Sequence, residues 1–476
     1  MPITVDQAAQ KIHSLVNDDG FMGTSRNDHM HEINALLKQF SGADVDKIVG
    51  KLSDSDLSGW ASDINSGGIF GAQGLSGGEK RDLFNEMAQD LDGTQLARLS
   101  SVFSGRDEAL ALGDAVATFA PAASKLDYVK AMAGRATDRD SSMDNGLGYN
   151  SLITGDKDAL AVGKVLASMA SDPATFNAAV KSLDANQLAA VLKAGEGERV
   201  TTYWGSGMGG GATANASTTF DPAVLRGVLD AAAASGDAQT KARVFDAAAG
   251  TLKDIRDSDS LLSPNPAAGD TAKKVADGMT AIMNSDTRGV VDALNTRDAS
   301  GKALTRYLSE VLTENPSSNN PVLGRQIAQL QGAGTASNAS AFINTPENQG
   351  GKDFYRNAQN LGYYAGATEA AINKMNADDK TKADILTNAF STVLSVATTA
   401  VTKLPVSGKV VSGLANGLSK ELIREVTADV AAGRKSLREA LYDLALPRAS
   451  PTADRYRGPA DPFFQSAANT VILNNQ

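Results

Sequence analysis

The sequence contains no cysteine, only three histidines and few aromatic residues, which make up 5 % of the chain. Without cysteine the chain can form no disulfide, no thiolate zinc site and no cysteine nucleophile. The three histidines, His13, His29 and His31, all lie near the N-terminus. This distribution gives poor support to a Ser-His-Asp catalytic arrangement.

Positive charge is also scarce. Lysine and arginine together number 45 against 55 acidic residues, which gives a net charge of -10, and the chain has no long basic run. An acidic surface repels phosphate backbones, so we expect no nucleic-acid partner.

The N-terminus lacks a Sec signal. The stretch MPITVDQAAQKIHSLVNDDG has no charged region followed by an apolar one, as a signal peptide would. If the protein is exported, a specialised non-Sec secretion system must read another signal. Otherwise we expect a cytoplasmic protein.

What the chain does contain is alanine and apolar residues at helical spacing. Hydrophobic residues make up 42 % and charged residues 21 % of the 476 residues, which is typical of a globular protein. Stripes such as Leu83, Met87 and Leu91 recur at the period of a helix, whereas strand-like alternation is scarce. Alanine favours helices and close helix contacts. The pattern predicts an all-α protein.

A short pattern, Leu-x-x-x-x-Leu, occurs at 52–57, 91–96 and 183–188. In the last two copies Asp92 and Asp184 are each followed by glutamine three residues later. This spacing is that of a capping box, so we expect a helix to start after each aspartate.

A longer match indicates duplicated helical modules. The segment from Gly155 aligns with the segment from Gly269, and Met169 then aligns with Met283. We expect modules stacked in an elongated array, with chance similarity between alanine-rich helices as the alternative. The expected organisation is an N-terminal helical segment (1–50), module 1 (51–149), module 2 (150–264) with a glycine-rich insertion (201–220), module 3 (265–334), a C-terminal helical subdomain (335–446) and a proline-rich extended tail (447–476).

The insertion TTYWGSGMGGGATANASTTF raises the question of a phosphate-binding loop. A Walker A loop needs a lysine after its glycines, and here none follows. A dinucleotide fingerprint needs a strand before it, whereas NQLAAVLKA looks helical. We therefore interpret the insertion as a mobile loop, with ligand binding as the weaker alternative. Tyr203 and Trp204 could contact a partner or the membrane.

Two acidic clusters contain residue types suited to catalysis or metal binding. DHMHE at 28–32 spaces its histidines by two, which points them about 200° apart on a helix, so we expect a solvated helix start and no metal site. Glu196 and Glu198 could serve a hydrolase that needs two carboxylates across a glycosidic bond, but 55 acidic residues yield such pairs often. We expect no cofactor.

An uncharged stretch of 18 residues, ILTNAFSTVLSVATTAVT, runs from 385 to 402 and approaches the length of a membrane span. Its threonines and serines lower its hydrophobicity. With the following Pro/Gly break and small-residue segment, it predicts an apolar helical hairpin over 385–419. The hairpin is either buried core or membrane-inserting, in which case Phe390, Val393 and Val396 would make membrane or partner contacts.

The C-terminal third carries the order NLGYYAGATEAAINKM, NAFSTVLSVATTAV, KLPVSGKVVSGLANGL and KSLREALYDLALP. This order resembles the helical region of bacterial secreted effectors and polymorphic toxins. LFNEMAQDLDGTQLARLSSVF and DPATFNAAVKSLDANQLAAVL are similar to the preceding helical part of such proteins, so the resemblance covers about residues 50–447. In the toxin families an enzymatic domain commonly follows, but only 29 residues remain after Pro447.

The resemblance and the composition together predict a secreted bacterial effector that acts through protein or membrane contacts and is not an enzyme. Its partners would be secretion machinery, a chaperone or immunity protein, or a protein or membrane of the target cell. Two alternatives stay open: a cell-wall-directed hydrolase using Glu196 and Glu198, and an intracellular helical scaffold.

Overall fold

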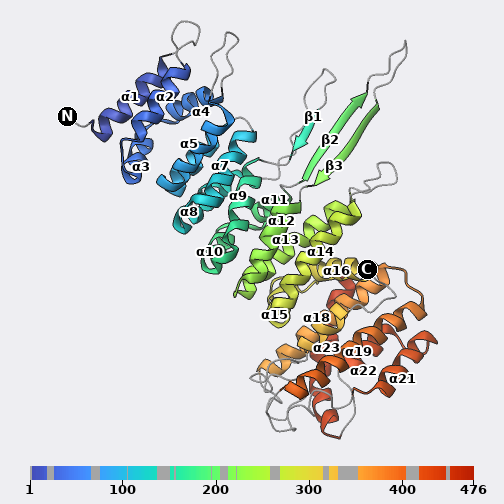
Figure 1. Cartoon of the computed structure of the whole chain (residues 1–476). Coiled ribbons are helices and arrows are strands. Elements are labelled where there is room, and N and C mark those ends of the chain that lie inside the picture. The colour runs from blue at the N-terminus through green and yellow to red at the C-terminus, as the bar shows by residue number, and fades with distance from the viewer. Residues whose placement is uncertain are drawn as a thin grey trace, which may run out of the picture. The chain divides into compact units, whose positions relative to one another are not determined.

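The computed structural model describes residues 3–18, 26–65, 75–103, 106–136, 151–154, 157–193, 196–203, 213–220, 222–257, 268–314, 321–330, 352–403, 418–445 and 451–476. Within these ranges the chain forms 22 α-helices and one small antiparallel sheet (Figure 1). The prediction of a helical protein is therefore confirmed, with the sheet as an exception.

The chain divides into two compact units, Met1–Gly236 and Asp237–Gln476. This division falls inside the predicted module 2 and coincides with none of the expected boundaries. We call the two parts unit 1 and unit 2.

The helices of unit 1 pack serially. Each of α3 to α8 contacts the helix two positions further along, which gives one row of α3, α5, α7 and α9 and a second row of α4, α6, α8 and α10. Such nearest-neighbour packing is characteristic of helical repeat proteins. The helices of unit 1 are α1 (Val5–Asn17), α2 (Arg26–Leu37), α3 (Gly42–Lys51), α4 (Asp54–Asn65), α5 (Gly77–Asp90), α6 (Gly93–Val102), α7 (Arg106–Phe119), α8 (Ala122–Met132), α9 (Lys157–Ser168), α10 (Pro173–Ser182), α11 (Ala185–Lys193) and α12 (Pro222–Ala234).

The predicted helix starts are confirmed. The Asp92 side chain accepts the Gln95 N–H at 2.8 Å at the start of α6. At the start of α11, the Asp184 backbone N–H donates to the Gln187 side chain at 2.8 Å, and the Gln187 backbone N–H donates to the Asp184 side chain at 2.8 Å. These bonds satisfy amides that the first helical turn leaves without a partner.

The aligned segments of modules 2 and 3 fold alike locally. Asp172 caps α10, and Asp286 caps α15 (Thr287–Arg297) at the aligned position. The methionines that precede them, Met169 and Met283, are both buried. The two aligned segments therefore share a buried methionine and a capping aspartate.

Unit 2 is organised around the long helix α18, which contacts α15, α16, α17, α22 and α23. A buried polar network joins four of its helices: Thr280 and Gln326 bond to the Tyr307 hydroxyl at 2.9 and 2.8 Å, and the Tyr364 hydroxyl donates to Gln326 at 2.7 Å. Burial raises the pKa of Tyr307 to about 12, although its hydrogen bonds act in the opposite direction. The remaining helices of unit 2 are α13 (Ala238–Asp257), α14 (Ala268–Ser285), α16 (Lys302–Glu314), α17 (Pro321–Leu330), α18 (Lys352–Lys374), α19 (Asp379–Lys403), α21 (Lys420–Ala431), α22 (Leu437–Ala445) and α23 (Pro451–Asn475).

The extended tail predicted for 447–476 is wrong, because residues 451–475 form α23. Pro451 occupies the first helical position, where the missing N–H costs nothing. Further on, apolar residues recur at helical spacing and are buried: Phe464, Ala467, Ala468, Val471 and Ile472. Packing of this stripe outweighs the local preference of a proline-rich segment for an extended conformation.

The sheet corrects the interpretation of 201–220 as a loop throughout. Its strands are β1 (Ser151–Thr154), β2 (Glu196–Tyr203) and β3 (Thr213–Phe220), in the order β1-β2-β3 and all antiparallel. Glu196 pairs with Phe220 and Tyr203 with Thr213. The threonines of β3 favour an extended backbone, which the count of glycines did not reveal. Residues 204–212, including Trp204, lie outside the described residues.

The apolar stretch of 385–402 falls on α19. Phe390 and Val393 are buried, and Val396 is half-buried. Helix α19 packs against α17, where Gly324 allows close approach: a Cβ there would lie 2.3 Å from the Ala389 carbonyl oxygen. The second arm of the predicted hairpin, at 404–417, lies outside the described residues. Among the helices that are described, none has the length and apolar character to cross a membrane.

Candidate functional site

A groove of about 590 Å³ runs between α5 and α7 of unit 1. The α5 residues that line it recur every three or four positions, so they form one helical face. From α5 the groove is lined by Gly77, Lys80, Arg81, Phe84 and Asn85, and from α7 by Glu108, Ala111, Asp114, Ala115, Thr118 and Phe119.

Small side chains leave the groove open. Ala111 and Ala115 are one helical turn apart on α7 and do not reach across to α5. Phe84 is buried, and its ring packs edge-on against Phe103 with the ring centroids 5.4 Å apart. Phe119, by contrast, is 43 % exposed and adds an apolar surface to the groove. The groove therefore offers room and apolar contact area together.

The charges of the groove are mostly compensated. Lys80 Nζ lies 3.4 Å from Glu108 Oε1, with both side chains largely buried. Asp114 pairs at 2.7 Å with Lys164, which reaches over from α9. Arg81 is exposed and has no ion-pair partner within the part of the chain that the structure describes. The groove thus keeps one guanidinium available to a ligand.

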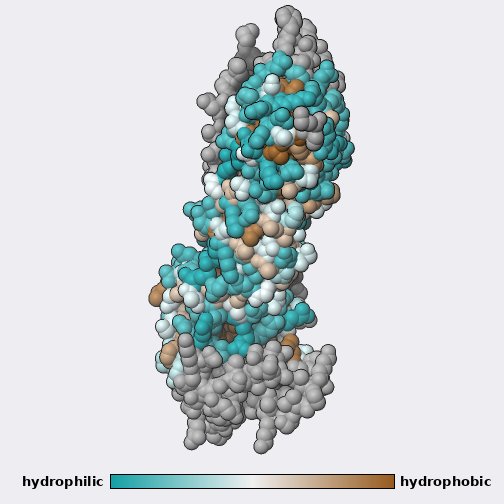
Figure 2. Space-filling model, turned by 90° about the vertical axis from the view of Figure 1, so that its left-hand side faces the viewer, coloured by the Kyte–Doolittle hydropathy of each residue, from teal (hydrophilic) through white to brown (hydrophobic). Residues whose placement is uncertain are grey.

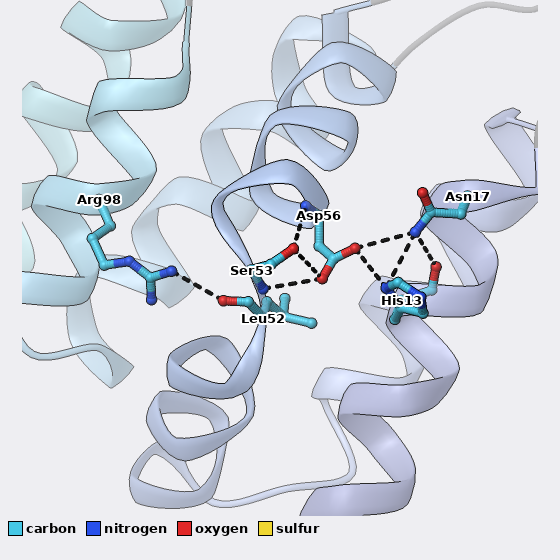
Figure 3. A network of polar contacts seen from close by, with 6 residues as sticks. All are labelled: His13, Asn17, Leu52, Ser53, Asp56 and Arg98. Carbon is cyan, nitrogen blue, oxygen red and sulfur yellow. Dashed lines mark hydrogen bonds and ion pairs between the residues drawn. The ribbon is translucent and has the colours of Figure 1, made fainter.

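A second polar cluster joins α1 to the start of α4 (Figure 3). His13 Nδ1 lies 2.6 Å from Asp56 Oδ1, and Asn17 Nδ2 donates to the same oxygen at 3.1 Å. The other oxygen of Asp56 accepts the Ser53 backbone N–H at 3.0 Å and the Ser53 hydroxyl at 2.7 Å. Nearby, Arg98 from α6 donates to the Leu52 carbonyl oxygen at 3.0 Å. Three helices are tied together at this point.

These bonds control the ionisation of Asp56. Burial alone would raise its pKa, but the hydrogen bonds from Ser53, His13 and Asn17 outweigh burial and lower the pKa to about 2. Asp56 is therefore an anion at neutral pH.

The cluster contains a histidine held by a carboxylate, and these are two of the three members of a catalytic triad. The Ser53 hydroxyl, however, donates to Asp56 and not to the imidazole (Figure 3). A serine bonded in this way is not activated by the histidine. The network instead caps α4 and fixes α1 against it.

The predicted hydrolase residues lie on the sheet. Glu196 and Glu198 occupy alternate positions of β2, which places them on the same face of the strand. Tyr203 is the last residue of β2. The structure does not describe their side chains, so their roles stay predictions.

None of the hairpin residues predicted to contact a membrane or partner is fully exposed. Phe390 and Val393 lie in the core of unit 2, so they serve packing in this structure. Val396 is only half-buried.

The DHMHE segment lies in the first turns of α2, with Asp28, His31 and Glu32 exposed. Glu32 pairs with Lys11 at 2.6 Å, and His31 Nε2 lies 4.0 Å from Glu79. Within the described residues no group of three or more histidine and acidic side chains is arranged to hold a metal ion.

Sequence reasoning missed the groove. The signal available was a pair of alanines one turn apart, Ala111 and Ala115, beside a phenylalanine at the end of the same helix. In an alanine-rich chain such spacing occurs often, so only the packing of α5 against α7 distinguishes a groove from an ordinary contact.

No protein-family model matches the chain, and neither does any curated protein. The functional assignment must therefore start from the groove itself.

Proposed function

We propose that this protein is a non-enzymatic secreted bacterial effector that works by binding another protein, and that a segment of this partner docks in the groove between α5 and α7. The observation that carries the proposal is the groove: it combines about 590 Å³ of space, an exposed phenylalanine and an uncompensated arginine.

The surroundings of the groove favour a protein segment as the occupant. Stacked helices present continuous surfaces that repeat proteins use to bind other proteins. Amphipathic helices commonly dock in grooves between helices, with apolar anchors below and charged groups at the rim. The groove has both features, with Ala111 and Phe119 for apolar contact and Arg81 for charge.

Protein contact is better supported than membrane contact. The apolar residues Phe390 and Val393 of α19 are buried within unit 2. On the face shown in Figure 2, hydrophobic residues surface as small, separate patches among hydrophilic ones. Stable attachment to a bilayer requires a larger continuous apolar surface or several lipid-binding elements.

The effector setting comes from the resemblance of residues 50–447 to helical regions of secreted effectors and polymorphic toxins. In that setting the protein would leave the cell through a specialised secretion system. Its partner would be a target-cell protein, or a chaperone or immunity protein of the producing cell. An intracellular scaffold would use the same groove without export.

The test compares two phenylalanines of similar exposure, Phe119 in the groove and Phe463 on α23, which is 41 % exposed. Full-length protein is used to capture partners from target-cell extract. Phe119→Asp should weaken capture about 30-fold, which corresponds to the roughly 2 kcal/mol lost at an interface hot spot. Phe463→Asp should capture like the wild type.

Circular dichroism checks that both variants keep the wild-type helix content. Equal capture by Phe119→Asp and wild type would refute docking in the groove. Dye release from liposomes by the wild-type protein would instead support a membrane role.

Cell-wall hydrolysis is a second candidate, because Glu196 and Glu198 share one face of β2. Paired glycosidase carboxylates are separated by about 5 to 9.5 Å. Digestion of purified peptidoglycan by the wild type, abolished in both Glu196→Gln and Glu198→Gln, would establish this function.

A further inference from the structure

The charge balance of the groove indicates the chemistry of its partner. Of the two cations that line the groove, Lys80 is engaged by Glu108, while the second carboxylate of the lining, Asp114, is engaged by Lys164 from outside the lining. The four charged groups of the lining sum to zero, but Lys164 neutralises Asp114 from α9, so the groove keeps one uncompensated positive charge although the whole chain carries -10. The charge that remains unmatched among the described residues is that of Arg81.

We infer that the groove recognises an acidic, amphipathic segment of the partner protein, in which a carboxylate side chain binds Arg81 and a large apolar side chain fills the space over Ala111 and Ala115. This inference rests on the proposed function and specifies its partner. A guanidinium binds a carboxylate through two parallel hydrogen bonds, so Arg81 provides direction as well as charge.

The apolar part of the inference follows from the shape of the groove. Alanine side chains at 111 and 115 leave a hollow, and Phe119 supplies an apolar wall that water covers in the free protein. A large aliphatic or aromatic side chain would fill the hollow and remove that wall from water, which is the main favourable contribution at such contacts.

A basic segment fits this groove less well. A lysine or arginine entering it would meet Arg81 and would have to displace Lys80 from Glu108 or Lys164 from Asp114. The partner segment is therefore acidic rather than basic.

The experiment identifies the segment and then reverses its charge. A photo-crosslinking phenylalanine analogue replaces Phe119 in the full-length protein, and the crosslinked partner peptide is sequenced and synthesised. Binding of that synthetic peptide is measured against wild type, Arg81→Glu and a matched control, Arg325→Glu, an exposed arginine of α17 in unit 2.

We expect the crosslinked peptide to contain an aspartate or glutamate near a large apolar residue. Arg81→Glu should weaken its binding about tenfold or more, and Arg325→Glu should not change it. A peptide in which the acidic residue is changed to lysine should bind Arg81→Glu better than it binds the wild type.

Two failures are distinguishable. If Phe119→Asp abolishes binding but Arg81→Glu does not, or if the peptide lacks an acidic residue, the inferred chemistry is wrong while docking in the groove stands. If neither variant weakens binding, docking in the groove is wrong as well.

Discussion

Asp56 connects two helices through a single carboxylate. One oxygen holds His13 and Asn17 of α1, and the other holds Ser53 at the start of α4. The bonds between Ser53 and Asp56 also cap the start of α4, a helix start that was not predicted from the sequence. The long-range partners could not be predicted, because nothing local relates His13 to a residue 43 positions away.

The lowered pKa of Asp56 predicts how the stability of unit 1 depends on pH. The folded-state pKa is about 2, below the ordinary value of 3.8, so the ionised carboxylate stabilises the fold above about pH 4. This contribution is lost as the pH falls from about 4 to 2. Asp56→Asn should lower the free energy of unfolding by about 2 kcal/mol at pH 7. It should also flatten the dependence of stability on pH between about pH 4 and 2.

Trp60 reports on this change, since it is fully buried on α4 close to Asp56 in the sequence. The chain has two tryptophans, so the experiment uses urea unfolding followed by Trp60 fluorescence in a Trp204→Phe background. Asp44→Asn, which removes a half-buried carboxylate paired with Lys47, serves as the control and should have a much smaller effect. A pH profile unchanged by Asp56→Asn would contradict the assignment.

At the level of elements, the close contact of α18 with α23 depends on two glycines. A Cβ at Gly362 would lie 2.2 Å from the Phe464 carbonyl oxygen, and one at Gly366 would lie 2.7 Å from that of Ala468. No side chain larger than hydrogen fits at these distances without moving the helices apart. The glycines therefore set the spacing at which Phe464 and Ala468 are buried.

Gly366→Val should destabilise unit 2 by about 3 kcal/mol, because the added side chain overpacks the contact. Gly250→Ala on α13, where a Cβ meets open space, should instead be neutral or stabilise by about 0.5 to 1 kcal/mol. Urea unfolding followed by circular dichroism measures both. Wild-type stability in Gly366→Val would mean that α23 does not pack on this face of α18.

The elements could be predicted where the local pattern and the packing agree. Stripes such as Leu83, Met87 and Leu91 and caps such as Asp92 lie as the sequence indicated. The prediction failed where long-range packing decides, as in α23. The prediction also failed for β3. Its threonines favour an extended backbone, but the segment lacks the alternation of polar and apolar residues by which a half-buried strand is recognised.

At the scale of the molecule, the sequence indicated repetition but not the division into two units. The aligned aspartates Asp172 and Asp286 both cap helices, one on each side of the division at 236 and 237. Beyond α15, unit 2 departs from serial packing, because α18 gathers helices that are distant in sequence, such as α23. The groove likewise depends on which helices become neighbours, and the spacing of apolar residues along the sequence does not predict these neighbours.

Hydrogen–deuterium exchange of the full-length protein, alone and with its captured partner, tests the central claim most directly. Docking in the groove predicts that the partner slows amide exchange chiefly within 77–90 and 106–119, with little change in 379–403. Protection centred on α19 or on the strands β2 and β3, with α5 and α7 unchanged, would contradict it.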